Sequence, residues 1–334
     1  MAVNIGLFHD LDEVARDAGG ALDRAARPCL FERLDWFRLV AAHCPPPGRL
    51  LAIRAGEGDG RAWLFLAAKG HAAMAYANWY ALRVGIVGSE RDDVMTSLAK
   101  DLRKQDIACL DLGPIERPEP LAAGLKRTGW AVRMRPGKAN WRIDTAGMDF
   151  VAYWATRPAR LRNTFRRKAK AAGLEVRVHD DFDAAAWTDY EAVYRASWKP
   201  EEGSFPFLRA LAEQEGAAGA LRLGLAYKDG TPVAAQLWLV ENDEATIHKL
   251  AYAEDARALS PGTILTEAMF RHVLDRDRVN RVDYGTGDEP YKADWMGERR
   301  MLWHLAAYDR RSLRGLAAMA RDAASALAGR WRSG

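Results

Sequence analysis

Several ionisable side chains lie close together near the C-terminal end of the sequence: Asp283, Asp288, Glu289, Tyr291 and Lys292. A tight turn does not require so many titratable groups, which favours a chemical role for part of this cluster. Acid–base catalysis needs groups that take up and release protons, and a developing negative charge needs a hydrogen-bond donor. Carboxylates, a phenol and an ammonium group supply these functions. We therefore expect part of a group-transfer site here.

The segment that precedes this cluster has the features of a helix N-terminus that binds a phosphate group. Ser260 is a strong N-cap residue, Pro261 suits the first helical position, and Gly262 lets another group approach the backbone closely. A helix N-terminus offers unpaired N–H groups and a partial positive charge. An ordinary capped helix is the alternative. The predicted cofactor-binding residues are Arg257, Ser260, Pro261, Gly262 and Thr263.

Two polar side chains interrupt a stretch with strand alternation at residues 246–252. Alternation places His248 on the face of Leu250 and Tyr252, and it places Lys249 on the opposite face. One of the two polar side chains must then point into an apolar layer, which is unusual unless that layer borders a cleft. The ordinary pKa of a histidine suits a general base, and a hydrogen-bonded core histidine is the alternative. The predicted substrate-binding residues are Lys249, Asp288, Gln236 and Trp198.

The composition indicates a folded protein with a large core. Of the 334 residues, 49% are hydrophobic and 28% are charged, and the length suits two domains. The net charge of +4 gives no argument for a nucleic-acid partner. Cys29, Cys44 and Cys109 lack the spacing of metal ligands and leave one cysteine unpaired in any disulfide scheme. We therefore expect no metal site, and cysteine usage favours the reducing cytoplasm.

The hydropathy pattern predicts neither a signal peptide nor a transmembrane segment. The first residues include several acids, and no uncharged stretch approaches the ~20 residues that a membrane-spanning helix needs. Residues 311–334 are expected to form an amphipathic basic helix. This helix either makes a peripheral contact with a membrane surface or packs on its own protein.

Helical and strand patterns recur in the same order in both halves of the chain. In the second half, two helices precede a three-stranded meander, a helix that begins at Pro261, a strand that ends at Gly285, a short helical piece and a last strand. The first half is a weaker copy, in which residues 110–113 match residues 282–285. The repeat predicts a tandem duplication.

We predict an α/β (α+β) fold with two domains, each built on a mixed, mostly antiparallel sheet flanked by helices. The domains are expected at residues 1–148 and 149–310, followed by the helix at 311–334. A helix in the first half begins with acidic residues at 89–93, which would repel a phosphate group. The cofactor site is therefore expected in the second domain, and the first domain is expected to be non-catalytic.

Several motifs, in a fixed order, give the chain a resemblance to a known superfamily: RLRNTFRRK at 160–168, SPGT at 260–263, VDYG at 282–285, DEPYK at 288–292, and Trp295. From about residue 153 to residue 308 the chain resembles the Gcn5-related N-acetyltransferase (GNAT) superfamily. More narrowly, it is similar to the bacterial BioF2-like or CelD-like acetyltransferases, relatives of the Fem-type peptidyltransferases. The resemblance implies two acetyltransferase-like domains in tandem and transfer of an acyl group from a thioester or an aminoacyl ester. Residues 257–262 contain one glycine where typical superfamily members have a glycine-rich turn, which fits the narrower group better.

The predicted catalytic residues are Asp283, Tyr291, Lys292 and His248. Asp283 ends a strand beside the cofactor helix, where it would take a proton from the acceptor or orient it, or else cap the next turn. The resemblance implies that Tyr291 protonates the departing thiolate, and a packed aromatic ring is the alternative. It also implies that Lys292 binds a phosphate or polarises a carbonyl, and a solvated surface lysine is the alternative. Asp288 would bind an amine acceptor or remain an ordinary loop acid.

Three functional hypotheses follow. The first is a cytoplasmic acyltransferase that moves an acetyl or other acyl group from acetyl-CoA or another acyl-CoA to an amine or hydroxyl of a small-molecule or glycan acceptor, such as a sugar or cell-envelope precursor. Direct attack is expected, because no cysteine or serine lies in a nucleophile motif. The second is a Fem-like aminoacyltransferase that contacts tRNA through the basic run 157–170; it ranks lower because only Phe165 could stack on bases there. The third is a non-catalytic scaffold with an acetyltransferase fold. The sequence defines neither the acceptor nor the oligomeric state.

Overall fold

The computed structural model describes residues 3–332, without the side chains of residues 326–332. The chain divides into two compact units. Unit 1 comprises Met1–Lys138 and Met301–Gly334, and unit 2 comprises Ala139–Arg300. Both ends of unit 2 lie before the predicted boundaries at 149 and 310, because the end of one long strand, at residues 140–144, pairs within unit 2.

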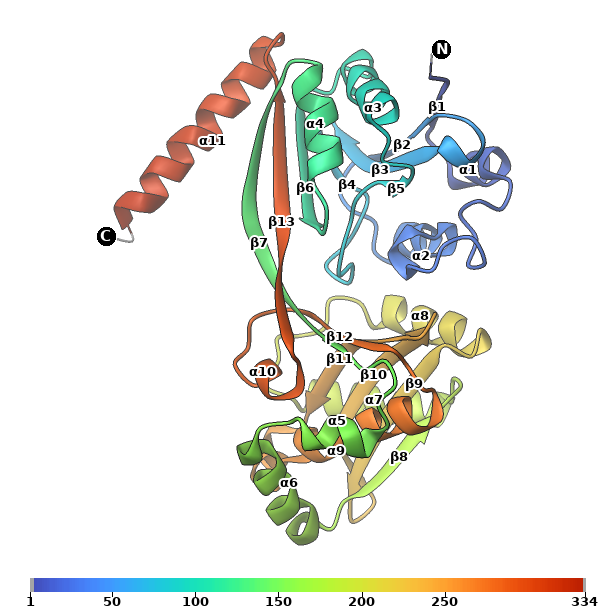
Figure 1. Cartoon of the computed structure of the whole chain (residues 1–334), viewed down its shortest axis with the longest axis vertical. Coiled ribbons are helices and arrows are strands. Elements are labelled where there is room, and N and C mark those ends of the chain that lie inside the picture. The colour runs from blue at the N-terminus through green and yellow to red at the C-terminus, as the bar shows by residue number, and fades with distance from the viewer. Residues whose placement is uncertain (1–2, 333–334) are drawn as a thin grey trace. The chain divides into compact units, whose positions relative to one another are not determined.

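Unit 2 contains helices and strands in the predicted order: two helices before the three-stranded meander, then a helix, a strand and a short helix, with α5, α6 and β8 preceding them all (Figure 1). Its elements are α5 (Phe150–Ala155), α6 (Ala159–Ala172), β8 (Glu175–His179), α7 (Ala184–Arg195), α8 (Phe205–Ala217), β9 (Leu221–Lys228), β10 (Thr231–Glu241), β11 (Glu244–Tyr252), α9 (Pro261–Arg271), β12 (Arg281–Thr286) and α10 (Lys292–Trp295). The strand order is β7-β12-β11-β10-β9-β8, where β7 is the strand Trp130–Asp144. All neighbours are antiparallel except β11 and β12.

Polar residues fix where several helices of unit 2 begin. Asp149 accepts a hydrogen bond from the backbone N–H of Ala152, and Asp183 accepts one from Ala186, both at 2.7 Å. Ser204 caps α8 in the same way. Each side chain satisfies an N–H group that the helix itself leaves without a partner.

The core of unit 2 lies between α9 and the sheet. Leu265, Met269 and Phe270 of α9 are fully buried, and the ring of Phe270 meets Trp238 of β10 edge-on at 5.3 Å between centroids. Tyr153 of α5 stacks on the other side of Phe270 at 4.6 Å. These apolar contacts hold the N-terminus of α9 against the middle strands.

Strands β11 and β12 are neighbours only at one end. They pair in parallel at residues 244–246 and 281–283, and no pairing follows. A β-bulge also interrupts β11, because Leu237 of β10 pairs with Lys249 whereas Trp238 pairs with Ile247. His248 is the extra residue, and the bulge breaks the alternation that was expected to place it with Leu250 and Tyr252.

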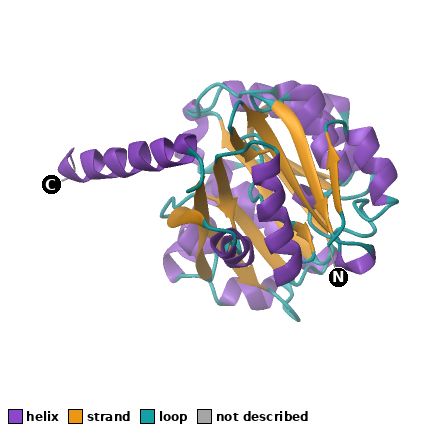
Figure 2. Ribbon diagram, turned by 90° about the horizontal axis from the view of Figure 1, so that it is seen from above, coloured by secondary structure: helices purple, strands orange, loops and turns teal. Residues whose placement is uncertain are grey.

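Unit 1 repeats the same order of elements. It contains β1 (Ile5–Phe8), α1 (Leu11–Ala18), α2 (Leu34–His43), β2 (Arg49–Ala55), β3 (Ala62–Lys69), β4 (Ala72–Ala75), β5 (Val87–Gly88), α3 (Asp92–Lys104), β6 (Cys109–Ile115), α4 (Glu119–Arg127) and β7. Its strand order is β1-β2-β3-β4-β6-β13, where β13 is the strand Glu298–Asp309. Figure 2 distinguishes the strands from the helices that flank them.

The two units share a topology that confirms the predicted fold class and duplication. In unit 1, β4 pairs in parallel with β6 up to Asp111, as β11 pairs with β12 up to Asp283. The last strand of each half pairs antiparallel with a strand of the other half: β7 with β12, and β13 with β6. The sequence pattern did not predict this exchange.

The last helix, α11 (Leu313–Arg332), follows β13 and belongs to the predicted segment 311–334. Arg133 forms an ion pair with Asp322 of this helix at 2.7 Å, which ties it to β7. Residues 333–334 of the predicted segment lie outside the described residues. No helix in the described part of the chain is long and apolar enough to cross a membrane.

Candidate functional site

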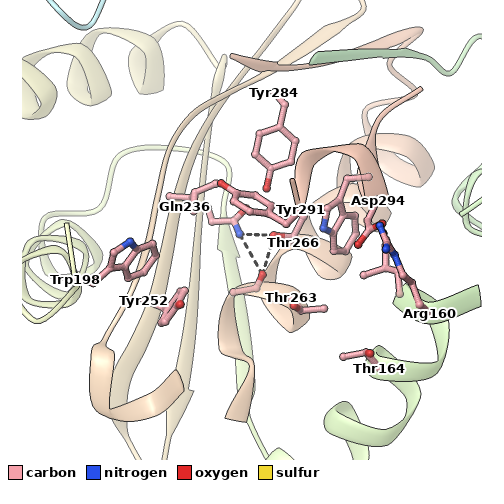
Figure 3. A pocket seen from close by; sticks show the side chains of 14 residues that line it. Arg160, Thr164, Trp198, Gln236, Tyr252, Thr263, Thr266, Tyr284, Tyr291 and Asp294 are labelled. Carbon is pink, nitrogen blue, oxygen red and sulfur yellow. Dashed lines mark hydrogen bonds and ion pairs between the residues drawn. The ribbon is translucent and has the colours of Figure 1, made fainter. Parts of the chain in front are cut away.

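Unit 2 contains a cavity of about 390 Å³ beside the start of α9 (Figure 3). Strands β10, β11 and β12 supply one wall, and α6, α9 and the segment around α10 supply the others. The lining residues are Arg160, Leu161, Thr164, Trp198, Gln236, Leu250, Tyr252, Gly262, Thr263, Thr266, Tyr284, Tyr291, Asp294 and Trp295. The cavity lies where β11 and β12 no longer pair, so the separation of these strands gives it room.

The start of α9 borders the cavity through Gly262 and Thr263. A Cβ atom at Gly262 would lie 3.3 Å from the ring of Tyr252, so the glycine keeps this edge open. Ser260 does not cap the helix with its side chain, contrary to expectation. Its φ of 56° puts the backbone in the left-handed region, which does not bring the hydroxyl to the first N–H groups.

The other two residues predicted to bind a cofactor do not line the cavity. Pro261 is buried at the helix start. The side chain of Arg257 is 74% exposed and lies 3.6 Å from the carboxylate of Glu254. An ion pair this exposed adds little stability, so the guanidinium can reorient at small cost.

A chain of hydrogen bonds crosses the floor of the cavity. The indole N–H of Trp238 donates to Oε1 of Gln236 at 2.8 Å, and Nε2 of Gln236 donates to Oγ1 of Thr266 at 2.7 Å. Thr266 donates in turn to the carbonyl oxygen of Gly262 at 2.7 Å, and Tyr284 lines the same cavity. Burial holds the pKa of Tyr284 well above its ordinary value, so the phenol keeps its proton at neutral pH.

Tyr291 and Lys292 lie at the end of the cavity nearest Tyr284. The rings of Tyr284 and Tyr291 meet at 5.9 Å, and burial, together with the charge of Glu289, raises the pKa of Tyr291. Lys292 is only 4% exposed. Its Nζ donates to the carbonyl oxygen of Thr286 at 2.8 Å, pairs with Glu289 at 2.9 Å and lies 5.3 Å from the ring centre of Tyr284. Lys292 is therefore not a solvated surface lysine; it holds the loop that carries Tyr291.

Asp283 lies on the other side of β12 from Tyr284 and does not line the cavity. It is 5% exposed, and its Oδ1 accepts hydrogen bonds from Nδ2 of Asn140 and from the backbone N–H of Gly285, each at 2.7 Å. Asn140 is held in turn by Arg300 at 2.7 Å. In this arrangement the carboxylate caps the turn after β12, which is the second of the two roles considered from the sequence.

His248, Lys249 and Asp288 are also placed away from the cavity. Burial, with the nearby charge of Lys249, lowers the pKa of His248 to about 3, which makes the imidazole a weak base. Lys249 forms an ion pair with Glu202 at 2.9 Å. Asp288 pairs with Arg299 at 2.5 Å and belongs to an exposed loop.

The cavity thus brings together five of the predicted site residues, namely Trp198, Gln236, Gly262, Thr263 and Tyr291. The sequence reasoning did not assign Tyr252, Thr266 or Tyr284. Thr266 follows Gly262 by one helical turn, which is a usable signal. Tyr284 adjoins Asp283 on a strand, so their side chains point to opposite faces of the sheet. Which of the two reaches the cavity depends on which face borders it.

The basic helix α6 forms one rim of the cavity. Arg160 and Thr164 line it, and Arg160 pairs with Asp294 at 2.5 Å. Lys168 donates to the carbonyl oxygen of Ala258 at 2.7 Å, which fixes α6 beside the turn before α9. The helix places a row of cations next to the helix N-terminus. In the described part of the chain, no group of three or more His, Cys, Asp or Glu side chains could hold a metal ion.

Residues 156–293 match the family profile described as an acetyltransferase (GNAT) domain. Unit 2 is therefore a domain of the GNAT type, as the resemblance in sequence indicated. A comparison with curated proteins found no match.

Solved structures that resemble the chain cover most of its length. One is the C-terminal domain of a protein named as a lysylphosphatidylglycerol synthetase from Agrobacterium fabrum, with a TM-score of 0.60, 16% identity and coverage of 93% of this chain and 95% of that one. FemX aligns with a TM-score of 0.55, 11% identity and coverage of 80% and 94%. A tandem GNAT protein from the clavulanic acid biosynthesis pathway aligns with a TM-score of 0.51, 16% identity and coverage of 91% and 98%. At these identities the likeness shows the fold alone.

Proposed function

We propose that unit 2 transfers an acyl group, acetyl in the first instance, from acyl-CoA to an amine or hydroxyl of a sugar or cell-envelope precursor in the cytoplasm. One observation carries the proposal: a single cavity extends from the start of α9 to the buried Tyr284 and the adjacent Tyr291, in the space where β11 and β12 separate. The helix start and the cations of α6 would hold the phosphates of coenzyme A. Leu161, Leu250 and Trp295 give an apolar wall for its acyl-bearing arm.

The chemistry follows from the groups on the cavity wall. The acceptor attacks the thioester carbonyl directly and loses its proton to solvent, and the C–S bond breaks. Tyr291 gives its phenolic proton to the departing thiolate and regains one from water. A phenol whose pKa is raised by burial is protonated at neutral pH and can play this part. Gln236 and Tyr284 fix the geometry around the carbonyl.

A thermal-shift titration with acetyl-CoA tests donor binding. Ligand at ~100 times its dissociation constant should stabilise the fold by about 2.7 kcal/mol, which is a shift of a few degrees. Gly262→Glu should abolish the shift, because the new side chain meets Tyr252 and its charge repels phosphate. Ala185→Glu, an exposed position on α7, adds the same charge and should leave the shift intact. A shift that survives Gly262→Glu would refute the placement of the donor.

The aminoacyl-tRNA alternative is favoured by one observation, the basic face of α6 beside the cavity. Arg166 and Arg167 are exposed on this helix, together with the partly exposed Arg162. Fem-like transfer predicts tRNA binding that weakens steeply with salt and is lost when these three arginines become alanine. A stabilising shift with charged tRNA but none with acetyl-CoA would replace the first proposal with this one. No shift with either ligand would favour a scaffold without catalysis.

A further inference from the structure

A second group of charged side chains lies on the face of β11 opposite to the cavity. Leu250 lines the cavity, so alternation directs the neighbouring Lys249 to the other face, toward α7. The ammonium group of Lys249 lies 2.9 Å from Oε2 of Glu202 and 5.7 Å from the ring centre of Tyr194. The side chain of Glu202 is only 3% exposed. A carboxylate this buried requires cationic partners.

Lys199 brings a second ammonium group to the same place. Its segment is fixed to the end of β11, because Ser197 forms a β-bridge with Ala253 and the backbone N–H of Lys199 donates to Oγ of Ser197 at 3.3 Å. The ammonium group lies 5.7 Å from the ring centre of Tyr194 and 5.9 Å from that of Trp198. Within residues 3–332 the side chain of Lys199 forms no ion pair or hydrogen bond, since the nearby Glu202 pairs with Lys249.

Two lysines and one carboxylate, Lys199, Lys249 and Glu202, give this cluster an excess of positive charge. Burial and the charge of Lys249 lower the pKa of Lys199 to about 8, against the opposing effect of Glu202. Two residues that follow β12 also affect the pKa of Lys199: the charge of Glu289 raises it, and the charge of Lys292 lowers it. Two further titratable groups beside the lysines, His248 and Tyr194, are neutral at pH 7, because burial lowers the pKa of the first to about 3 and raises that of the second.

Two hollows flank the segment that carries Lys199. Trp198, its neighbour in the chain, lines the donor cavity. Glu202 lines a second hollow of about 660 Å³ between α7 and the start of α8, together with Arg195 and Arg209. Lys199 itself lines neither hollow, but its ammonium group lies 5.9 Å from the ring centre of Trp198, which borders the first, and its segment leads to Glu202, which borders the second.

We propose that Lys199 and Lys249 form an anion-binding subsite that selects an acceptor bearing a carboxylate or phosphate group. The anion takes the place of the partner that Lys199 lacks, and the nucleophilic group of the same molecule enters the donor cavity beside Trp198. This inference deepens the proposed function by naming the chemical class of the acceptor. It concerns a binding site that can be measured without any acyl transfer.

Binding is measured by titration calorimetry on the whole chain with two pairs of probes. D-Glucosamine 6-phosphate is compared with D-glucosamine, and D-alanine with D-alaninamide, so that each pair differs by one anionic group. The pair with the larger difference in affinity between its charged and its neutral member shows whether the subsite prefers a phosphate or a carboxylate group. Variants are Lys199→Gln, the charge-preserving Lys199→Arg, and Lys126→Gln, an exposed lysine of α4, as the control.

We expect a charged probe to bind at least about tenfold more tightly than its neutral partner, since a charge-assisted hydrogen bond is at stake. Lys199→Gln should remove this preference, whereas Lys199→Arg and Lys126→Gln should retain it. The preference should be complete well below pH 8, about half lost near pH 8 and absent well above it, because the ammonium group of Lys199 loses its proton over this range. Equal affinity for charged and neutral probes, or a preference that survives Lys199→Gln, would overturn the inference. Loss of the acetyl-CoA shift with the anion preference intact would instead overturn only the proposed function.

Discussion

Replacement of Asp283 by alanine tests whether this carboxylate serves the fold or the chemistry. The change leaves the Nδ2 group of Asn140 and the backbone N–H of Gly285 buried without the acceptor that each now has at 2.7 Å. An orphaned buried donor costs about 1–3 kcal/mol. Asn140 keeps its bond to the carbonyl oxygen of Gly285 at 3.0 Å, so its loss is partial. We expect Asp283→Ala to lower the free energy of unfolding by about 2–4 kcal/mol, in the lower half of the range for two such donors.

Two further variants make the test specific. Asp283→Asn keeps an oxygen at the same place and should cost about 1 kcal/mol, the net value of an ordinary hydrogen bond. Asp111→Ala changes the equivalent residue of unit 1, where β4 and β6 stop pairing. The side chain of Asp111 is 59% exposed and pairs with His304 at 2.6 Å, so its loss should cost less than about 1 kcal/mol.

Urea unfolding followed by circular dichroism gives the free energies, and a thiol-release assay with acetyl-CoA gives the transfer rate. Because the chain has two units, separate transitions are fitted for each if both appear. The structural role predicts that Asp283→Asn, once folded, transfers acyl groups at a rate close to the wild-type rate. If Asp283→Ala has wild-type stability but no transfer activity, this reasoning is refuted and a catalytic role for Asp283 is supported.

Three other substitutions test the site from different directions. Tyr291→Phe should lower kcat roughly 10²-fold or more while KM for the donor changes little, because the leaving thiolate loses its proton source; a thiol-release assay that finds kcat unchanged would remove Tyr291 from the mechanism. His248→Phe should make stability less sensitive to acid. The pKa of His248 is lowered from 6.5 to about 3, so between these values only the unfolded chain binds the proton, and the stability present above pH 6.5 is lost as the pH falls. The free energy of unfolding is measured for the wild-type protein and for His248→Phe between pH 4 and 6.5, in ~0.5-unit steps. Equal slopes of this free energy against pH in the two proteins would contradict the linkage. Lys292→Met removes the bonds to Thr286 and Glu289 and should cost about 1–3 kcal/mol while weakening the acetyl-CoA shift. A shift of undiminished size in this variant would show that Lys292 does not hold the site.

Local sequence signals predicted the elements of unit 2 because their causes are local. Apolar spacing fixed the stripe of α9 that meets the sheet, and the proline and glycine at its start marked where it begins. The order of helices and strands followed from such patterns, whereas the GNAT-type fold was implied by the resemblance of the motifs. Trp198, Gln236, Gly262 and Thr263 were predicted as site residues for the same reason, since each lies at the end of an element or interrupts its pattern, whereas Tyr291 was assigned from the resemblance.

The tertiary structure decided which side chains face the cavity, because facing depends on strand pairing between segments far apart in the chain. A one-residue bulge opposite β10 removes His248 from the face of Leu250 and Tyr252. Pairing of β12 with β7 turns Asp283 toward Asn140, and the adjacent Tyr284 then faces the cavity instead. The exchange of β7 and β13 between the units is a pairing choice of the same kind. A sequence shows the period of a strand. Its register, and therefore which side chains face the cavity, is set only by the neighbouring strands that the whole fold brings beside it.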